Sequence, residues 1–272
     1  MLKIYNDVDS QLKTLHFLHG NSITPHSYSK LLNYFSDSFL VKYFLLRPLW
    51  YKESMPNFKN WKIFLDDYLD LIKNEDNIVG VGHSIGGNLL LKAALKRPEK
   101  FKKIILLDPT FIVPFKIRVW NFVSFFNLQS MFLPLIKSAK NKKIHYNSID
   151  DIYLSYRKKK IFSNFSNSDL KTLIKSIVIK REDGVKLVYP SDWDSRIYKT
   201  GMRNDMFIWN NISKLNVKIL IVRAEESNVF FRDAEKLLTK KNNKIEFQTI
   251  EGDHFFPINN AEKTIKLIEN YI

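Results

Sequence analysis

The chain has 272 residues, 45% of them hydrophobic and 26% charged, which is ordinary for a globular protein with one sizeable core. It contains no cysteine, so disulfide bonds and thiolate metal sites are excluded. The formal net charge is +15, but the basic residues are scattered. A nucleic-acid partner would require basic residues clustered with aromatic ones on one face, so we expect no nucleic-acid binding.

Apolar runs alternate with helical patterns along most of the chain. The runs are continuously apolar, which is typical of parallel strands covered on both faces. This alternation predicts an α/β fold with a mostly parallel central sheet flanked by helices. The expected strands are residues 15–18, 39–46, 78–81, 104–107, 217–222 and 245–250, and the expected helices are residues 26–35, 61–72, 88–95, 230–238 and 261–271.

The segment Gly82-His83-Ser84-Ile85-Gly86-Gly87 lies between a predicted strand and a predicted helix. A G-x-S-x-G sequence in this context is the signature of a nucleophile elbow. Glycines are needed there because the turn brings backbone segments close together and strains nearby dihedral angles. The pattern predicts Ser84 as a nucleophile at the carboxyl end of the sheet. The alternative is a glycine-rich turn in which the serine has no role.

The first predicted strand runs into His19-Gly20-Asn21. A loop at this place can donate a backbone N–H to an oxyanion hole, with the second N–H coming from the residue after the nucleophile. We therefore expect the backbone amides of Asn21 and Ile85 to form this hole. His19 is expected to brace the loop.

The alternation stops between Thr110 and Met206. Residues 119–136 contain no charged residue but several polar ones, so they are too polar for a membrane span. Apolar residues at 119, 122, 123 and 126 have helical spacing. We interpret residues 110–206 as a helical cap inserted after the strand that ends at Asp108, with residues 1–109 and 207–272 forming the core. The apolar face of the cap has three possible roles: it covers the site above Ser84, it packs between cap helices, or it makes weak contact with a membrane surface.

Six segments occur in the order used by the α/β-hydrolase superfamily, and the chain resembles its serine-nucleophile esterase and lysophospholipase-like branch. Epoxide hydrolases and haloalkane dehalogenases share the fold but have an aspartate in place of Ser84. The resemblance implies the α/β-hydrolase fold and His254 as the general base. The segments are His19-Gly20-Asn21, residues 82–87, Leu107-Asp108-Pro109, the cap, residues 221–225 and residues 252–257.

The catalytic acid departs from the family pattern. The resemblance places an aspartate near Ser227 or Asn228, and neither residue can carry the charge that stabilises an imidazolium. Asp108 is the preferred candidate, although Asp108-Pro109 also fits a plain strand-terminating turn. Glu225 and Glu226 are the alternative acids. A Ser–His dyad with Asn228 would have weak activity.

These residues predict a serine hydrolase that cleaves a carboxylic ester or thioester with an apolar acyl part through an acyl-enzyme at Ser84. The mechanism needs neither a metal nor an organic cofactor. Two alternatives remain open: cleavage of an amide or carbon–carbon bond by the same machinery, or a binding protein that has lost its acid. Residues 1–9 lack the apolar core of a signal peptide, so we expect a cytoplasmic protein without a transmembrane segment.

Overall fold

The computed structural model describes residues 1–6 and 12–272, so part of the segment on which the absence of a signal peptide rests lies outside the described residues. Its centre is a seven-stranded sheet with the order β1-β3-β2-β4-β5-β9-β10. Strand β1 pairs antiparallel with β3, and the other strand pairs of this sheet are parallel. The strands are β1 (Leu2–Ile4), β2 (Lys13–Leu18), β3 (Phe39–Phe44), β4 (Ile78–His83), β5 (Phe101–Leu107), β9 (Lys218–Ala224) and β10 (Ile245–Ile250).

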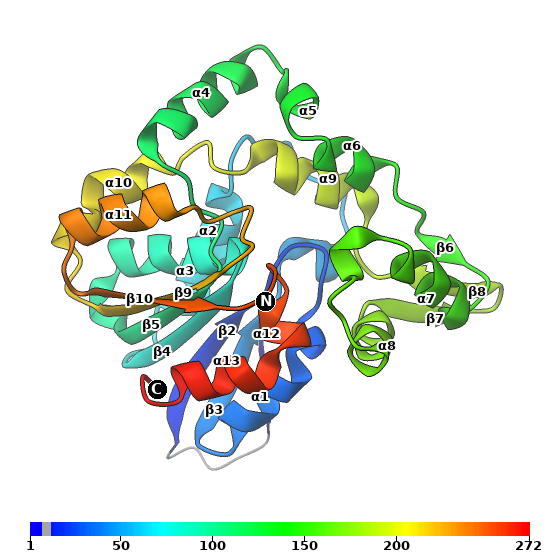
Figure 1. Cartoon of the computed structure of the whole chain (residues 1–272), viewed down its shortest axis with the longest axis horizontal. Helices are drawn as coiled ribbons and strands as arrows, with labels where there is room; N and C mark the ends of the chain where they lie inside the picture. The colour runs from blue at the N-terminus through cyan, green and yellow to red at the C-terminus, as the bar shows by residue number, and fades with distance from the viewer. Residues whose placement is uncertain (7–11) are drawn as a thin grey trace.

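Helices cover both faces of this sheet (Figure 1). One face is covered by α2 (Lys62–Leu71), α3 (Ile85–Lys96), α10 (Met206–Asn211) and α11 (Arg232–Lys241), and the other by α1 (Ser29–Ser36) and α13 (Ala261–Ile268). Side chains alternate along each strand, so Ile104 and Leu106 join one core cluster and Ile105 and Leu107 join the other. The expected mostly parallel sheet flanked by helices is therefore confirmed.

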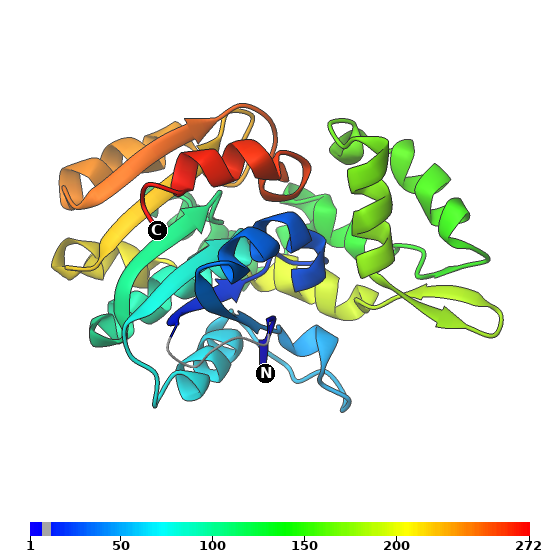
Figure 2. The same ribbon diagram turned by 90° about the horizontal axis from the view of Figure 1, so that it is seen from below.

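The chain between β5 and α10 forms a separate group of elements above and beside the carboxyl ends of the strands (Figures 1 and 2). Besides the expected helices it contains a three-stranded sheet with the order β6-β8-β7, which the sequence analysis did not predict. The elements are α4 (Pro114–Phe125), α5 (Gln129–Phe132), α6 (Leu135–Lys140), β6 (His145–Tyr146), α7 (Ile149–Arg157), α8 (Asn167–Ser176), β7 (Val178–Arg181), β8 (Gly184–Leu187) and α9 (Ser191–Thr200).

This group of elements packs into both core clusters. Trp193 and Ile197 of α9 join the cluster that contains Phe64, whereas Leu170 and Ile174 of α8 join the opposite one. We keep the division into a core (1–109 and 207–272) and a cap (110–206) as a proposal.

Short helical segments connect the larger elements. The short segments are α12 (Phe256–Asn259) and the 3-10 helices at Pro25–Tyr28, Arg47–Leu49, Pro98–Lys100, Lys160–Phe162 and Ile212–Lys214.

None of the helices in the described ranges combines the length and apolar character of a membrane span.

Candidate active site

Ser84 occupies the turn between β4 and α3. Its backbone dihedral angles are φ 57° and ψ −122°, a strained conformation for a residue with a side chain. The flanking glycines are required sterically, because a Cβ on Gly86 would lie 2.1 Å from the carbonyl oxygen of Leu18 and a Cβ on Gly82 would lie 2.7 Å from that of Gly86. The strand, tight turn and helix have the geometry that a nucleophile elbow requires.

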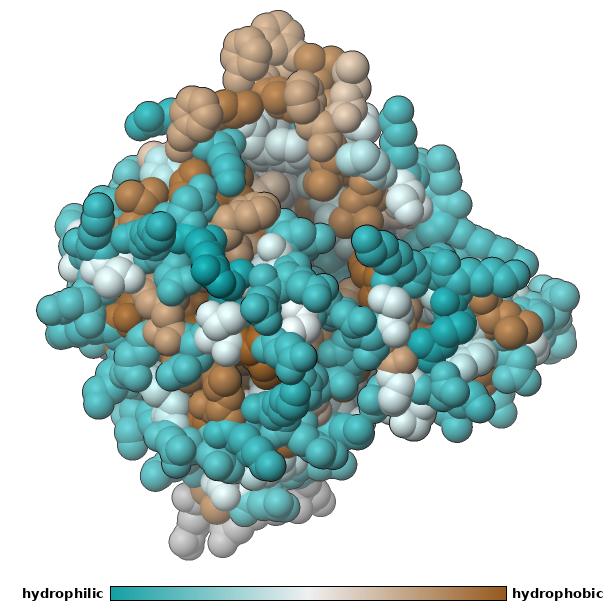
Figure 3. Space-filling model, viewed as in Figure 1, coloured by the Kyte–Doolittle hydropathy of each residue, from teal (hydrophilic) through white to brown (hydrophobic). Residues whose placement is uncertain are grey.

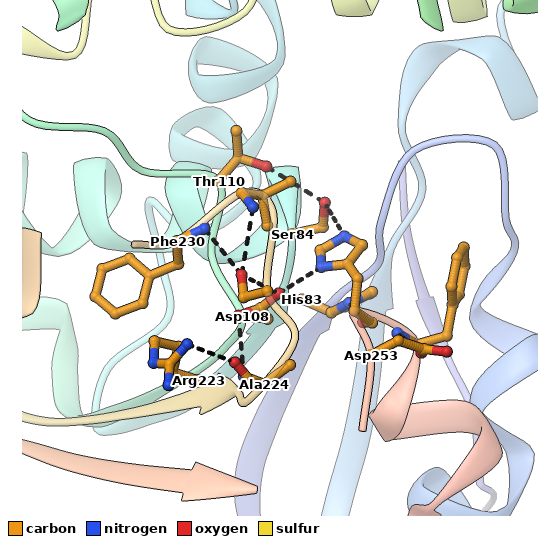
Figure 4. A network of polar contacts seen from close by, with 12 residues as sticks. His83, Ser84, Asp108, Thr110, Arg223, Ala224, Phe230 and Asp253 are labelled. Carbon is orange, nitrogen blue, oxygen red and sulfur yellow. Dashed lines mark hydrogen bonds and ion pairs between the residues drawn. The ribbon is translucent and has the colours of Figure 1, made fainter. Parts of the chain in front are cut away.

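The structure brings Ser84, His254 and Asp108 together from three separate parts of the chain. Ser84 and Asp108 are labelled in Figure 4. The Nε2 atom of His254 lies 3.0 Å from Ser84 Oγ, and its Nδ1 atom lies 2.7 Å from Asp108 Oδ2. A carboxylate can only accept, so Nδ1 carries the proton and Nε2 is left to accept from the serine hydroxyl. This arrangement can deprotonate the hydroxyl and stabilise the imidazolium that forms.

The carboxylate of Asp108 is fully buried and is held by donors from β9 and the loop after it. Its Oδ1 atom accepts from the amide of Ala224 at 3.1 Å, and its Oδ2 atom accepts from the hydroxyl of Ser227 at 2.9 Å as well as from His254. Ser227 therefore lies where the resemblance places the acid, and it supports a carboxylate from Asp108, the residue that follows the neighbouring strand β5. The sequence gives no signal for this role, since a serine cannot carry the charge of the acid.

The alternative acids lie elsewhere. Glu225 and Glu226 are exposed, and their backbone amides donate to the carbonyl oxygens of Ile250 and Gly252. Within the described residues, no hydrogen bond joins either carboxylate, or Asn228, to His254. Asp253 accepts from the amide of Phe255 at 2.8 Å and shapes the turn beside His254.

A second chain of hydrogen bonds lies beneath the site and was missed by the sequence analysis. The amide of Gly20 donates to the Tyr28 hydroxyl at 3.1 Å, which donates to Nδ1 of His83 at 2.6 Å. The Nε2–H of His83 in turn donates to the backbone carbonyl of His254 at 2.8 Å. Burial, with a smaller contribution from His254, lowers the pKa of His83 well below its usual value. A neutral His83 thus ties the loop after β2 to the loop that carries His254.

The loop after β2 packs against the first turn of α3, where the backbone of Leu18 and His19 approaches Gly86 closely. His19 braces this loop as expected: one ring nitrogen bonds the carbonyl of Gly20 at 2.7 Å and the other accepts from the amide of Leu46 at 3.2 Å. Burial lowers the pKa of His19 to about 4, so its ring is neutral. Among the hydrogen bonds of the described residues, none is donated by the amide of Asn21 or Ile85, and we keep their role in an oxyanion hole as a proposal.

Thr110 is a further neighbour that the sequence did not single out. Its hydroxyl lies 3.3 Å from Ser84 Oγ, and its amide donates to the Ser84 carbonyl at 3.1 Å. The next residues, 111–113, are apolar and buried and lead directly into α4. In the part of the chain that the structure describes, no group of three or more histidine and acidic side chains is placed to hold a metal ion.

Comparisons with known proteins agree with this fold. A family profile described as the alpha/beta hydrolase fold matches residues 52–133. No curated protein sequence matches the chain significantly. The match and the structural neighbours confirm the resemblance to the α/β-hydrolase superfamily that the motifs predicted.

Three similar solved structures illustrate the fold. An E-2-(acetamidomethylene)succinate hydrolase is 16% identical with a TM-score of 0.75, over 99% of this chain and 93% of that one. A thioesterase domain from the curacin biosynthetic pathway is 15% identical with a TM-score of 0.71, over 99% of each chain. A peroxisomal alpha-beta-hydrolase from Saccharomyces cerevisiae is 16% identical with a TM-score of 0.76, over 99% of this chain and 80% of that one. At these identities the likeness shows the fold alone.

Proposed function

The chain has the α/β-hydrolase fold, and from this premise we propose that it is a serine hydrolase acting on a carboxylic ester or thioester with an apolar acyl part. The observation that carries the proposal is the hydrogen-bonded series of Ser84, His254 and Asp108 at a strained strand-to-helix turn. A serine in a strained turn that contacts a correctly oriented imidazole is arranged to act as a nucleophile. A turn with only a structural role would need neither the strain nor the imidazole.

The proposed reaction follows from the hydrogen-bond directions. Ser84 Oγ attacks the carbonyl carbon while its proton passes to His254 Nε2. The amides of Asn21 and Ile85 donate to the oxyanion, and Asp108 stabilises the imidazolium. His254 then protonates the leaving group. Water, deprotonated by the same histidine, releases the acyl group and restores the serine.

We propose an apolar acyl part because apolar residues adjoin Ser84 and Thr110 in the chain. The segment that leaves the site through Thr110 is wholly apolar from Phe111 to Val113, and Ile85 is buried beside Ser84. Similar folds include a thioesterase domain and a hydrolase of a substituted succinate, so the fold accommodates more than one acyl chemistry. Amide or carbon–carbon cleavage would use the same residues, and a substrate panel separates these reactions.

The binding-protein alternative depended on the missing acid after β9. The contact between Asp108 and His254 supplies a carboxylate from the loop after β5 instead and favours catalysis. Labelling with a fluorophosphonate probe tests the proposal. We expect rapid labelling of the wild type that disappears in Ser84→Ala. A folded wild-type protein that does not react would overturn the proposal and favour ligand binding.

A further inference from the structure

Helices α4 and α5 expose a row of large apolar side chains at the outer surface of the cap. We call this row the apolar ridge, and in Figure 3 it forms the brown projection over α4 and α5. Each member is between 53% and 78% exposed. Single exposed apolar residues are ordinary, but a contiguous group marks an interaction surface. The apolar ridge consists of Phe115, Phe122, Phe125, Phe126, Met131 and Phe132.

The ridge is not an unfilled core face. Ile117, Trp120 and Val123 already bury the inner face of α4, and the Trp120 indole donates to the carbonyl of Gly201 at 2.8 Å. The outer face carries Phe122 and Phe126, whose rings are 5.0 Å apart. A helix with one face in a core and the other in water normally carries charged residues on the outer face. The outer face of α4 therefore fits an apolar partner.

The charge around the ridge identifies that partner. Residues 109–149 contain six basic residues and no aspartate or glutamate. Three of the six, Lys116, Lys140 and Lys142, pair with aspartates from other segments, so we count beside the ridge only the basic side chains for which the described residues show no such pair. A cavity of about 480 Å³ lies beside Phe125, and its wall includes Lys59, Arg196, Lys199 and Arg203 without any carboxylate. The cavity is therefore suited to an anion such as a headgroup phosphate.

We propose that the apolar ridge inserts into the surface of a bilayer containing anionic phospholipid, with the basic cavity holding a lipid phosphate. Interfacial segments combine aromatic side chains on one face with lysine and arginine beside them, and they bind anionic membranes through both features. A second copy of the chain is a poor occupant, because it would bring the same basic surface and the same net charge of +15 against the ridge. The proposal is independent of the hydrolase activity.

Vesicle sedimentation tests the proposal, with all variants made in a Ser84→Ala background so that no lipid is cleaved. We expect binding to mixed phosphatidylcholine–phosphatidylglycerol vesicles, weakening as salt is raised, and much less binding to phosphatidylcholine alone. The double variant Phe122→Ser, Phe125→Ser should bind about tenfold more weakly or worse. The matched control Leu154→Ser, Ile161→Ser removes exposed apolar residues outside the ridge and should bind like the parent.

The basic cavity is tested separately. Lys199→Gln and Arg203→Gln should each weaken binding to the anionic vesicles by roughly fivefold. Circular dichroism establishes that each variant is folded. Absence of binding, equal binding to neutral vesicles, or equal losses in the ridge and control variants would overturn the proposal. A dimer detected by light scattering and abolished by the ridge substitutions would also overturn it, since the occupant would then be protein.

Discussion

Replacing Asp108 by asparagine is the sharpest test of the proposed acid. The side chain keeps its shape, and the amide of Ala224 donates to Oδ1 at 3.1 Å, so the oxygen of the asparagine should stay at that position. The new NH2 group then faces Ser227 and Nδ1 of His254. Because an NH2 group donates, it forces Nδ1 to become the acceptor and moves the imidazole proton to Nε2. Nε2 can no longer accept from Ser84, and the base is lost.

The expected effect is large. Asparagine in place of the acid lowers the turnover of a serine protease by about 10⁴, which corresponds to about 5.5 kcal/mol of lost transition-state stabilisation. We expect a similar decrease in the rate of fluorophosphonate labelling and in kcat for an activated ester. Glu225→Gln and Glu226→Gln are matched controls, because each also removes one negative charge from a loop that pairs with the backbone at Ile250 and Gly252, yet both side chains are exposed. Both should react at nearly the wild-type rate.

The reasoning would be refuted by an Asp108→Asn protein that is folded and labels within about tenfold of the wild-type rate. A slow Glu225→Gln or Glu226→Gln variant would name that residue as the acid. Equal slowing of all three would indicate that the effect comes from net charge rather than from the tautomer of His254.

Three further changes test how the fold supports the site. Asp205→Ala leaves the buried ammonium of Lys92 without its partner. The free energy of unfolding, measured by chemical denaturation, should fall by about 3–5 kcal/mol, whereas a fall below about 1 kcal/mol would mean that the pair is solvated. Gly86→Ala places a methyl group 2.1 Å from the Leu18 carbonyl and should abolish probe labelling, and unchanged labelling would contradict the packing of this turn. His19 has a folded-state pKa of about 4 against an ordinary value of 6.5, so below pH 6.5 the unfolded chain binds a proton that the folded chain does not. His19 should therefore contribute about 3 kcal/mol to the fall in the free energy of unfolding from pH 6.5 to 4, in addition to the contribution of the buried His83. His19→Gln should reduce the total fall by that amount, and an unchanged pH dependence would contradict this assignment.

The sheet and the elbow could be predicted because their signals are local. The central strands β4, β5 and β9 are buried over most of their length, so each contains a continuous apolar run, whereas the edge strand β10 is partly exposed and carries polar residues. The small cap sheet also had a local signal that was overlooked: Asp183-Gly184 lies between two short apolar alternating segments, and Arg181 pairs with Gly184 across the hairpin.

The sequence could neither decide between the candidate acids nor predict the buried hydrogen bonds through Tyr28 and His83, because both depend on contacts between distant segments. Asp108 becomes a partner of His254 only because β5 pairs with β9, which places the amide of Ala224 and the hydroxyl of Ser227 against its carboxylate. The hydrogen bond to Nδ1 of His83 comes from Tyr28, which lies 55 positions earlier in the chain. Strand pairing and helix docking determine such contacts, and no short pattern encodes them.

For the charge-free segment 119–136, the sequence could not tell which side chains are buried and which are exposed. Its apolar residues occupy nearly the whole circumference of α4, so helical spacing alone is compatible with a buried helix and with a helix at an interface. The exposed fractions of the side chains distinguish the two faces. Ile117, Trp120 and Val123 are buried, whereas Phe122 and Phe126 are exposed. The inward residues stabilise the cap by burial, whereas the outward ones remain largely in water. The proposed anionic bilayer would cover this exposed apolar face and attract the basic side chains beside it.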